Sequence, residues 1–206
     1  MRIIVFGASG GVGKELVQQA LAAGHEVTAF VRDSNRLPFQ HAKLNIVQGD
    51  GLDRDAVIHA IKGHDAVACC VGGSGLGRTS LMSEIAKHLA EGMTKHELNR
   101  IVYVASAGIH KELKGIIGGL IGFALRHVLA DHRKAYELLR DRDNQLSWTV
   151  ARPMQLTYGP RTEVYRETLN GQAPQGQKIS RADVAHFLLK ALSNEMYTNQ
   201  SVGLAY

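Results

Sequence analysis

Short hydrophobic runs alternate along the chain with longer stretches in which apolar residues recur every three or four positions. The short runs predict strands and the longer stretches predict helices. The predicted strands cover residues 2–6, 26–31, 43–47, 65–71, 100–105, 147–151 and 201–205. The predicted helices cover residues 12–23, 53–61 with Asp53 as N-cap, 80–98, 126–142 and 181–192. This alternation predicts an α/β fold: a single Rossmann-type domain over residues 1–206, with a doubly wound, mainly parallel sheet, helices on both faces and a small C-terminal substrate-side region.

The segment Gly115–Leu125 is strongly apolar and is bracketed by Lys114 and Arg126. It is shorter than the roughly 20 residues that a membrane-spanning helix requires. We therefore expect a buried or lid-like segment and no stable membrane insertion. Contact with the membrane interface is the alternative.

A glycine-rich loop with the sequence Gly7-Ala8-Ser9-Gly10-Gly11-Val12-Gly13 joins the first predicted strand to the first predicted helix. Glycines here permit a tight turn, a close approach of the backbone to a pyrophosphate, and close packing of helix on strand. Amides at the helix start then face the anion. The loop predicts a dinucleotide site with cofactor contacts at Gly7, Ser9, Gly10, Gly11, Val12 and Gly13. A nucleotide-triphosphate P-loop is excluded, because Ala8 and Glu15 stand where that motif needs glycine and Ser or Thr.

The end of the second predicted strand distinguishes NADP from NAD. An acid there suits the ribose hydroxyls of NAD, whereas an arginine suits the extra phosphate of NADP. Arg32 offers a planar fork to a phosphate, and Ser34 and Arg36 can add hydrogen bonds. We expect NADP(H) as the cofactor, with NAD(H) at lower affinity because Asp33 is also present.

Later strand ends extend the same site, because open α/β sheets bind ligands at the carboxyl ends of their strands. Asp50 and its neighbour Gly51 follow the third strand and are expected at the adenine. Gly72 and Gly73 follow the fourth strand and are expected beside the cofactor ribose.

The composition, with 45% hydrophobic and 21% charged residues, excludes a disordered or fibrous chain. The formal net charge is +5, but the basic residues are dispersed and often alternate with acids, as in residues 140–143. The sequence has no arginine-rich arm, zinc-finger spacing or aromatic RNA-binding signature. We expect no nucleic-acid partner, and a phosphate-bearing cofactor accounts for the excess charge.

The cysteines and histidines point to a reduced, metal-free protein. Cys69 and Cys70 are adjacent in a hydrophobic run and are expected to be reduced, which favours a cytoplasmic location. The ten histidines lack the spacing of a zinc motif, so no metal is predicted. His132 is expected at the surface of its long helix. A monomer is favoured over an oligomer.

These motifs together resemble the biliverdin-IXβ reductase/flavin reductase family, an atypical short-chain dehydrogenase/reductase group related to NmrA-like proteins. The resemblance rests on Gly7-x-x-Gly10-x-x-Gly13, Val31-Arg32-Asp33-Ser34-x-Arg36, Gly49-Asp50, Asp131-His132 and Ile179-Ser180-x-x-Asp183. It implies hydride transfer from NADPH to flavins, linear tetrapyrroles or quinones. It also implies that Ser106, after the fifth strand, lies beside the nicotinamide, and that Pro153 contacts the cofactor.

The sequence departs from its relatives in three places. The Tyr-x-x-x-Lys pair of ordinary short-chain dehydrogenases is absent, since Arg140 stands four residues after Tyr136, which disfavours a tyrosine base. Met154 stands where animal flavin reductases have a histidine, so we expect solvent to supply the proton. The apolar segment 115–125 replaces a more polar loop. We expect its large side chains to roof a pocket for a flat conjugated acceptor; they are Ile116, Ile117, Leu120, Ile121 and Phe123.

The sequence thus predicts an NADPH-dependent reductase of a flavin-, tetrapyrrole- or quinone-like acceptor. One alternative is a non-catalytic NADP(H)-binding redox sensor, which would use the same cofactor residues. A further alternative is a sugar-nucleotide epimerase-like enzyme. The missing Tyr-x-x-x-Lys pair and the short C-terminal region count against the epimerase.

Overall fold

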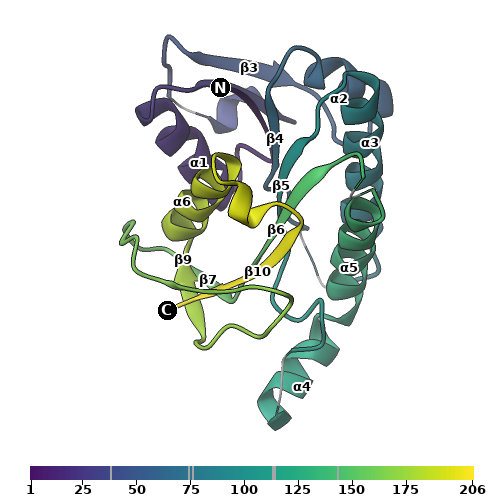
Figure 1. Ribbon diagram of the computed structural model, residues 1–206, viewed down its shortest axis with the longest axis vertical. Helices are drawn as coiled ribbons and strands as arrows, with labels where there is room; N and C mark the ends of the chain where they lie inside the picture. Colours follow the sequence, from purple (N-terminus) through teal and green to yellow (C-terminus); the bar gives the residue numbers. More distant parts are fainter. Residues whose placement is uncertain (38, 74, 76, 113–114, 143) are drawn as a thin grey trace.

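A computed structural model describes residues 1–37, 39–73, 75, 77–112, 115–142 and 144–206, with the side chains of 116 and 117 left out of the description. Its centre is a sheet of eight strands in the order β3-β2-β1-β4-β5-β6-β10-β8 (Figure 1). The strands are β1 Arg2–Phe6, β2 Glu26–Val31, β3 Leu44–Gln48, β4 Ala66–Cys69, β5 Arg100–Val104, β6 Ser147–Pro153, β8 Arg166–Thr168 and β10 Gln200–Ala205.

All neighbouring strands of this sheet are parallel except β10 and β8, which are antiparallel. The order reverses at β1, which pairs with β2 on one side and β4 on the other. Phe6, the last residue of β1, therefore stands opposite both Phe30 and Cys69. A reversal of this kind opens a crevice at the carboxyl ends of the strands, where α/β sheets bind ligands.

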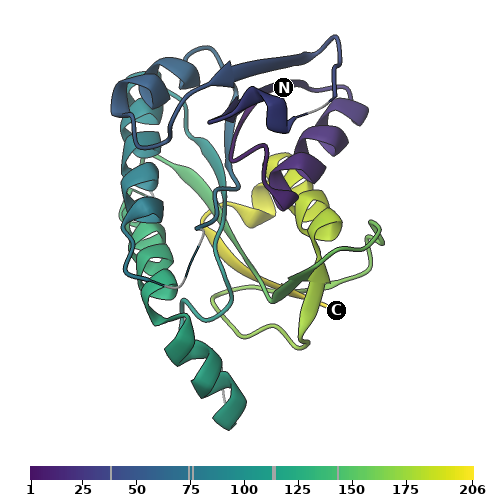
Figure 2. The same cartoon turned by 180° about the vertical axis from the view of Figure 1, so that it is seen from behind.

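Helices cover both faces of the sheet, each burying an apolar stripe. One face carries α1 Gly11–Ala22 and α6 Arg181–Leu192, which pack on each other. The other face carries α2 Arg54–Ile61, α3 Leu81–Lys95 and α5 Arg126–Arg140, and Figure 2 shows these from behind. In α1, for example, the buried positions Val12, Leu16 and Ala20 recur at helical spacing. The predicted doubly wound fold is confirmed.

Most predicted elements lie within a few residues of their observed bounds. Asp53 caps α2 as expected, since its carboxylate accepts a hydrogen bond from the amide of Ala56 at 3.0 Å. The sequence pattern missed β8 and the second sheet, formed by β7 Gln155–Thr157 and β9 Lys178–Ser180. It also missed two 3-10 turns, at Ser34–Arg36 and Glu195–Tyr197. Each of these elements has only three residues, too few to show an alternating pattern.

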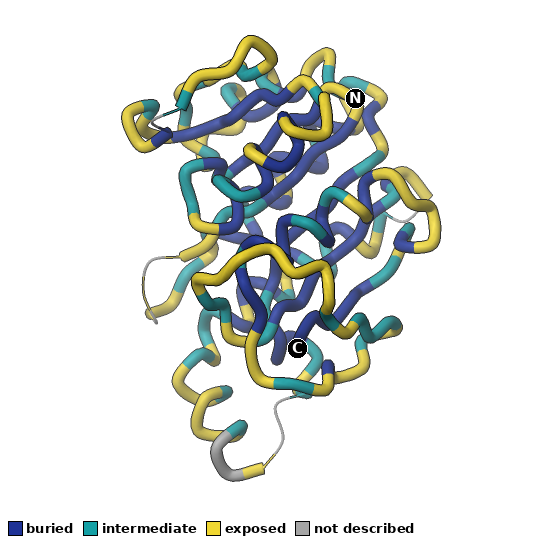
Figure 3. The backbone as a smooth tube through the Cα atoms, turned by 90° about the vertical axis from the view of Figure 1, so that its left-hand side faces the viewer, coloured by how far each residue is buried: buried dark blue, intermediate teal, exposed yellow. Residues whose placement is uncertain are grey.

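The apolar segment forms a helix, α4 Gly115–Ala124, that projects from one end of the molecule (Figures 1 and 2). The expectation of burial was wrong: Leu120 and Phe123 are each 67% exposed and Ile121 is 45% exposed. Figure 3 shows exposed turns of α4 beyond the buried strands. An apolar run indicates that a segment avoids water, but it does not indicate which neighbour covers it. Among the described helices, none is both long and apolar enough to cross a membrane.

Candidate functional site

The glycine loop follows β1 and turns the chain into α1. Gly7 has φ +75°, and a Cβ on it would lie 2.7 Å from the backbone of Cys70 and Val71. A Cβ on Gly13 would collide with the carbonyl oxygen of Gly7. The amide of Gly10 donates to that same carbonyl at 2.9 Å. Glycine is therefore required at both ends of the loop, at one for the turn and at the other for the close packing of α1 on β1.

Helix α1 begins in this glycine loop, and no side chain caps its N-terminus. Its N-cap is Gly10, no side chain accepts a hydrogen bond there, and the first turn contains no acidic residue. The first amides of a helix have no partner within the helix, and their partial positive charge favours an anion. A phosphate group fits this position.

An arginine from the other end of the chain lies against the loop. Arg181 is the first residue of α6, and a Cβ on Gly11 would lie 2.5 Å from the Arg181 Cδ atom. Its guanidinium stacks on the ring of Tyr158 at 4.1 Å. The Nη1 atom is buried and has no hydrogen-bond partner among the described residues. A buried, unpaired guanidinium nitrogen costs free energy, and an anion on the loop would provide its missing acceptor.

The end of β2 presents two exposed arginines, Arg32 and Arg36, with Ser34 half-buried between them. The intervening Asp33 is the N-cap of the 3-10 turn, and its carboxylate accepts a hydrogen bond from the amide of Asn35 at 3.0 Å. One carboxylate oxygen of Asp33 thus holds the turn. The arginines remain exposed at the edge of the sheet.

The ends of β3 and β4 continue this edge. Asp50 is exposed, and its carboxylate accepts from the amide of Leu52 at 3.0 Å. Gly51 lies against Ile85 of α3, where a Cβ would come within 2.8 Å of that side chain. Gly72 and Gly73 follow β4 and are both exposed, and a Cβ on Gly72 would meet none of the described atoms within 4 Å. The backbone after β4 is therefore open to a ligand.

Ser106 and Pro153 come together at the ends of β5 and β6. The amide of Ala107 donates to the carbonyl of Pro153 at 3.0 Å, which ties the two strand ends to each other. The Ser106 hydroxyl is half-buried and donates to the carbonyl of Ala107 at 3.1 Å. A ligand acceptor or donor at this edge would compete with that local hydrogen bond.

A buried ion pair holds the loop that follows Ser106. Glu112 accepts from Arg152, and both side chains are almost fully buried, at 5% and 0% exposure. Glu112 also accepts from the amide of His110 at 2.8 Å, while Arg152 donates to the carbonyl of Gln172 at 2.9 Å. Burial lowers the pKa of Arg152 despite its acidic partner. This pair fixes the loop to β6 and to the segment before β9.

The histidine expected at the surface is buried, so that prediction was wrong. His132 on α5 is 6% exposed, and its Nδ1 is hydrogen-bonded to the Tyr103 hydroxyl at 2.8 Å. Burial lowers the pKa of His132 to about 4, so the ring is neutral near pH 7. The sequence assigned it to the surface by residue type, but the Tyr103 hydroxyl provides a buried partner. No group of three potential metal-ligating side chains occurs in the described part of the chain.

Tyr136 is not at the edge with Ser106 but in an aromatic cluster. Its ring makes edge contacts with His110 at 4.9 Å and Trp148 at 5.6 Å, and Arg140 lies over it at 5.6 Å. With Asn170 and neighbouring residues these side chains line a hollow of about 580 Å³. The side chains of Tyr136 and Arg140 therefore pack α5 against Trp148 of β6.

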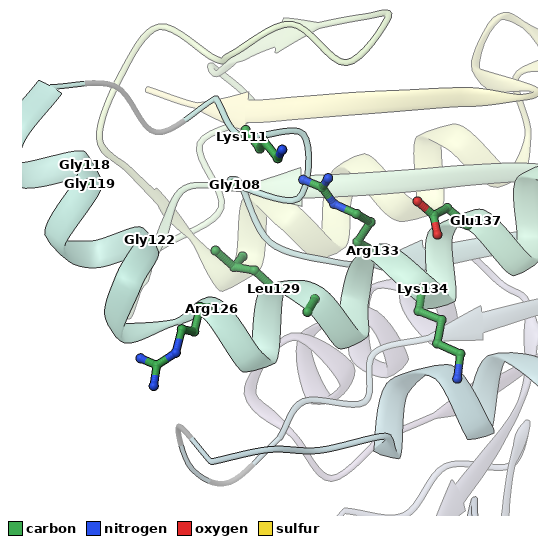
Figure 4. Close-up of a pocket in the computed structure, with 11 residues that line it drawn as sticks. Gly108, Lys111, Gly118, Gly119, Gly122, Arg126, Leu129, Arg133, Lys134 and Glu137 are labelled. Atoms are coloured by element: carbon green, nitrogen blue, oxygen red, sulfur yellow. The ribbon is translucent and has the colours of Figure 1, made fainter.

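A second hollow, of about 480 Å³, lies between α4, α5 and the loop after β5 (Figure 4). Glycines, not large apolar side chains, form the α4 side of it: Gly118, Gly119 and Gly122. The expected roof of Leu120, Ile121 and Phe123 is not seen, since all three are exposed and none lines this hollow. Ile116 and Ile117, the other two predicted roof residues, have side chains outside the described part.

The carboxyl edge as a whole thus brings together nearly every residue that the sequence marked as cofactor-binding. Strands β3, β2, β1, β4 and β5 are neighbours in the parallel part of the sheet. In that order, they are followed along the chain by Asp50, Arg32, the glycine loop, Gly72 and Ser106. The residues fit a dinucleotide, because the loop leaves no room for side chains at Gly7 and Gly13 and because the Arg181 Nη1 atom lacks an acceptor. Sequence reasoning missed Arg181 and Tyr158.

Comparison with known proteins agrees with this geometry. Residues 7–195 match the NAD(P)H-binding family. The chain belongs to that family. The resemblance to atypical short-chain dehydrogenases/reductases is confirmed at this level.

Curated relatives and structural neighbours of this chain include several named reductases. The 2-alkyl-3-oxoalkanoate reductase of Stenotrophomonas maltophilia is 25% identical over 91% of this chain and 64% of its own length. A short-chain dehydrogenase/reductase of Veillonella parvula in complex with NADP superposes with a TM-score of 0.83 at 20% identity, covering 100% of this chain and 94% of its own. ChuY of Escherichia coli O157:H7, an anaerobilin reductase, gives 0.81 at 21% identity and covers 100% and 97%.

The chain spans less than two thirds of the length of the curated relatives that it matches, for example 19%, 35% and 42% of three of them. The two structural neighbours, at 20% and 21% identity, show that this chain shares their fold. The family match establishes NAD(P)H binding for this chain. Several of the curated relatives are named reductases or dehydrogenases.

Proposed function

We propose that the chain is an NADPH-dependent reductase that transfers hydride to a flat conjugated acceptor of the flavin, tetrapyrrole or quinone type. The observation that carries the proposal is the common edge on which the glycine loop, Arg32 and Ser106 lie. Hydride transfer needs a dinucleotide stretched along such an edge, with its nicotinamide at the end nearest β5 and β6. The reductase ChuY supports the acceptor class as a structural neighbour.

Three groups of this chain would hold the cofactor. The amides at the start of α1 and the Arg181 guanidinium would bind the pyrophosphate, since the Nη1 atom has no acceptor within the described part of the chain. Arg32 and Arg36 would bind the 2′-phosphate, and two exposed guanidinium groups at this position favour NADPH over NADH. Asp50, Gly72 and Gly73 would flank the adenosine half and its ribose.

Bound NADPH supplies the hydride, and the protein contributes position and exclusion of water. Ser106 would orient the nicotinamide amide or the acceptor by exchanging its present bond to the Ala107 carbonyl. The Glu112–Arg152 pair would keep that loop rigid. The buried His132 is neutral and bonded to Tyr103, so the proton that accompanies the hydride would come from solvent.

The test is NADPH consumption by the purified chain with FMN, riboflavin, biliverdin isomers and small quinones, with NADH in parallel. We expect saturable turnover that favours NADPH and falls when Ser106 is replaced by Ala. Asn144→Ala, at an exposed position away from the edge, is the matched control. If NADPH binds tightly and no acceptor is turned over, the reductase proposal is wrong.

Tight NADPH binding without turnover would support a redox sensor instead. One observation favours that alternative. The exposed apolar side chains of α4 make a surface of the kind that marks interaction sites. An epimerase has less support, because Tyr136 packs against His110 and Trp148.

A further inference from the structure

Helix α4 exposes large apolar side chains at one end of the molecule. Leu120, Ile121 and Phe123 are all exposed, and the helix contains no acidic residue in its first turn and no basic residue in its last. The long axis of the molecule runs toward α4, which extends beyond the body formed by the sheet and the other helices (Figures 1 and 2). Water surrounds these side chains in the isolated chain, which is unfavourable for apolar surface.

The helix also lacks internal reasons to be stable in water. Gly115, Gly118, Gly119 and Gly122 make up four of its ten residues, and glycine is among the least favourable residues in a helix. A Cβ on Gly119 or Gly122 would meet none of the described atoms within 4 Å, so packing against the described part of the chain does not require glycine at these two positions. Short helices are stabilised mainly by burial of an apolar face. An apolar phase outside the chain would provide that burial.

Basic side chains lie beside the base of α4, on the loop after β5 and along α5 (Figure 4). Lys111, Arg126, Arg133 and Lys134 line the hollow beside it, with Glu137 the carboxylate among the lining residues (Figure 4). We call these four cations the basic collar. Among the described residues, none of the four takes part in an ion pair.

The acids closest in sequence to the basic collar are already engaged. The carboxylate of Asp131 accepts from the amides of Met82 and Ser83 at 2.9 and 3.0 Å. Glu112 is paired with the buried Arg152. The collar therefore presents net positive charge around an apolar tip.

We propose that α4 docks this protein reversibly on the surface of an anionic phospholipid bilayer. Leu120, Ile121 and Phe123 would enter the boundary between headgroups and acyl chains, and the basic collar would lie at the lipid phosphates. A ten-residue helix is about 15 Å long, which suits insertion to the interface and is too short to cross. This docking does not depend on the proposed reductase activity.

A bilayer fits the charge better than a second copy of the chain. A two-fold dimer through α4 would bring two copies of the same cationic region near one interface, and like charges repel. An anionic lipid surface attracts the same charges and also accepts apolar side chains without a preformed groove. The combination of an apolar tip with a cationic base thus selects a lipid surface as the partner.

The experiment is co-sedimentation of the full chain with vesicles of phosphatidylcholine alone and of phosphatidylcholine mixed with phosphatidylglycerol, at low and high salt. We expect binding to the mixed vesicles, little binding to the neutral ones, and loss of binding as salt screens the charges. The double variant Leu120→Gln with Phe123→Gln should release the protein. The matched control is Leu52→Gln with Val164→Gln, at positions that are 49% and 78% exposed elsewhere.

The basic collar is tested separately. Lys111→Gln with Lys134→Gln should lower the partition coefficient roughly 25-fold, or about fivefold for each cation lost. Lys62→Gln with Lys95→Gln removes two exposed lysines at the ends of α2 and α3 and should leave binding unchanged. Circular dichroism would check that each variant is folded. All of the substituted residues are exposed, so none of the substitutions removes a buried side chain.

Three outcomes would overturn the proposal. The first is equal sedimentation of the wild type with neutral and anionic vesicles, or none with either. The second is undiminished binding of the Leu120/Phe123 variant. The third is self-association of the wild type in lipid-free solution that the same variant abolishes, which would show that a second copy covers α4.

Discussion

Arginine side chains at three positions have very different surroundings. Arg181 lies on the loop itself, Arg32 is exposed at the end of β2, and Arg152 is buried with Glu112. Guanidinium groups remain charged and offer several donors in a plane, so their surroundings decide whether they bind a ligand or hold the fold. Arg152 has a protein partner, whereas Arg181 keeps one buried nitrogen without an acceptor.

Replacement of Arg32 by Ala should separate the two nicotinamide cofactors. We expect NADPH binding to weaken by about 1.5–3 kcal/mol, the value of a charged hydrogen bond, while NADH binding changes little. Titration of cofactor fluorescence with each ligand measures both affinities. An equal loss for NADH and NADPH would contradict the assignment of Arg32 to the 2′-phosphate.

Replacement of Arg181 by Met should affect a different part of the cofactor. Met keeps an apolar stem against Gly11 and Tyr158 but removes the donors, so affinity for NADPH and for ADP-ribose should fall roughly tenfold or more. Adenosine 2′-monophosphate has no pyrophosphate, so the variant should bind it with the same affinity as the wild type does. Calorimetry with these ligands is the measurement, and Tyr158→Phe, which keeps the ring, is the control. Unchanged ADP-ribose affinity would show that Arg181 is structural.

At the scale of elements, the loop after β5 depends on one buried ion pair. Glu112 joins the loop to β6 through Arg152, and Arg152 in turn contacts the carbonyls of Gln172 and Ser201. Removing one partner of a buried pair leaves the other charge without compensation. The stability of the segment that carries Ser106 is therefore coupled to the segment before β9.

Glu112→Ala should lower the free energy of unfolding by about 3–5 kcal/mol, because it leaves the Arg152 guanidinium buried and unpaired. Asp141→Ala breaks the exposed pair with Arg140 and should cost less than about 1 kcal/mol. Urea denaturation of both variants measures the difference. Similar small losses in the two variants would mean that the loop relaxes and exposes Arg152 to water.

The same elements show what the sequence could and could not predict. The glycine loop and Arg32 could be predicted because each follows a strand directly, and parallel strands place their ends on one edge. Ser106 was predicted only through the family resemblance. Arg181 was missed because its contact with Gly11 joins two helices far apart in sequence. The exposure of α4 was missed because hydrophobicity does not distinguish a core helix from one that projects into solvent.

At the scale of the whole molecule, the buried His132 makes stability depend on pH. Burial lowers its pKa from 6.5 to about 4 in the folded chain. Between these values the unfolded state binds a proton that the folded state does not, so stability rises with pH and is lost on acidification. The loss from this residue begins as pH falls below about 6.5 and ends near the folded pKa.

His132→Gln should therefore flatten the pH dependence of the free energy of unfolding. Below pH 6.5 the wild type should lose about 1.4 kcal/mol per pH unit more than the variant. Denaturant titrations at several pH values between neutrality and pH 5 measure both slopes. Since Gln can still bond to Tyr103, the comparison is one of slopes and not of absolute stability. Parallel slopes would show that His132 is protonated in the folded state.

The position of β10 in the sheet sets an order of events during synthesis. β10 lies between β6 and β8, although it follows both in the sequence, and its residues Gln200 and Ser201 pair with Thr149 and Val150. While a ribosome is still making the intervening residues, the free edge of β6 has no strand to pair with, and β8 has no neighbour at all. Unpaired strand edges attract other chains. The nascent protein thus passes through an interval in which chaperone protection matters most, and that interval closes when β10 emerges.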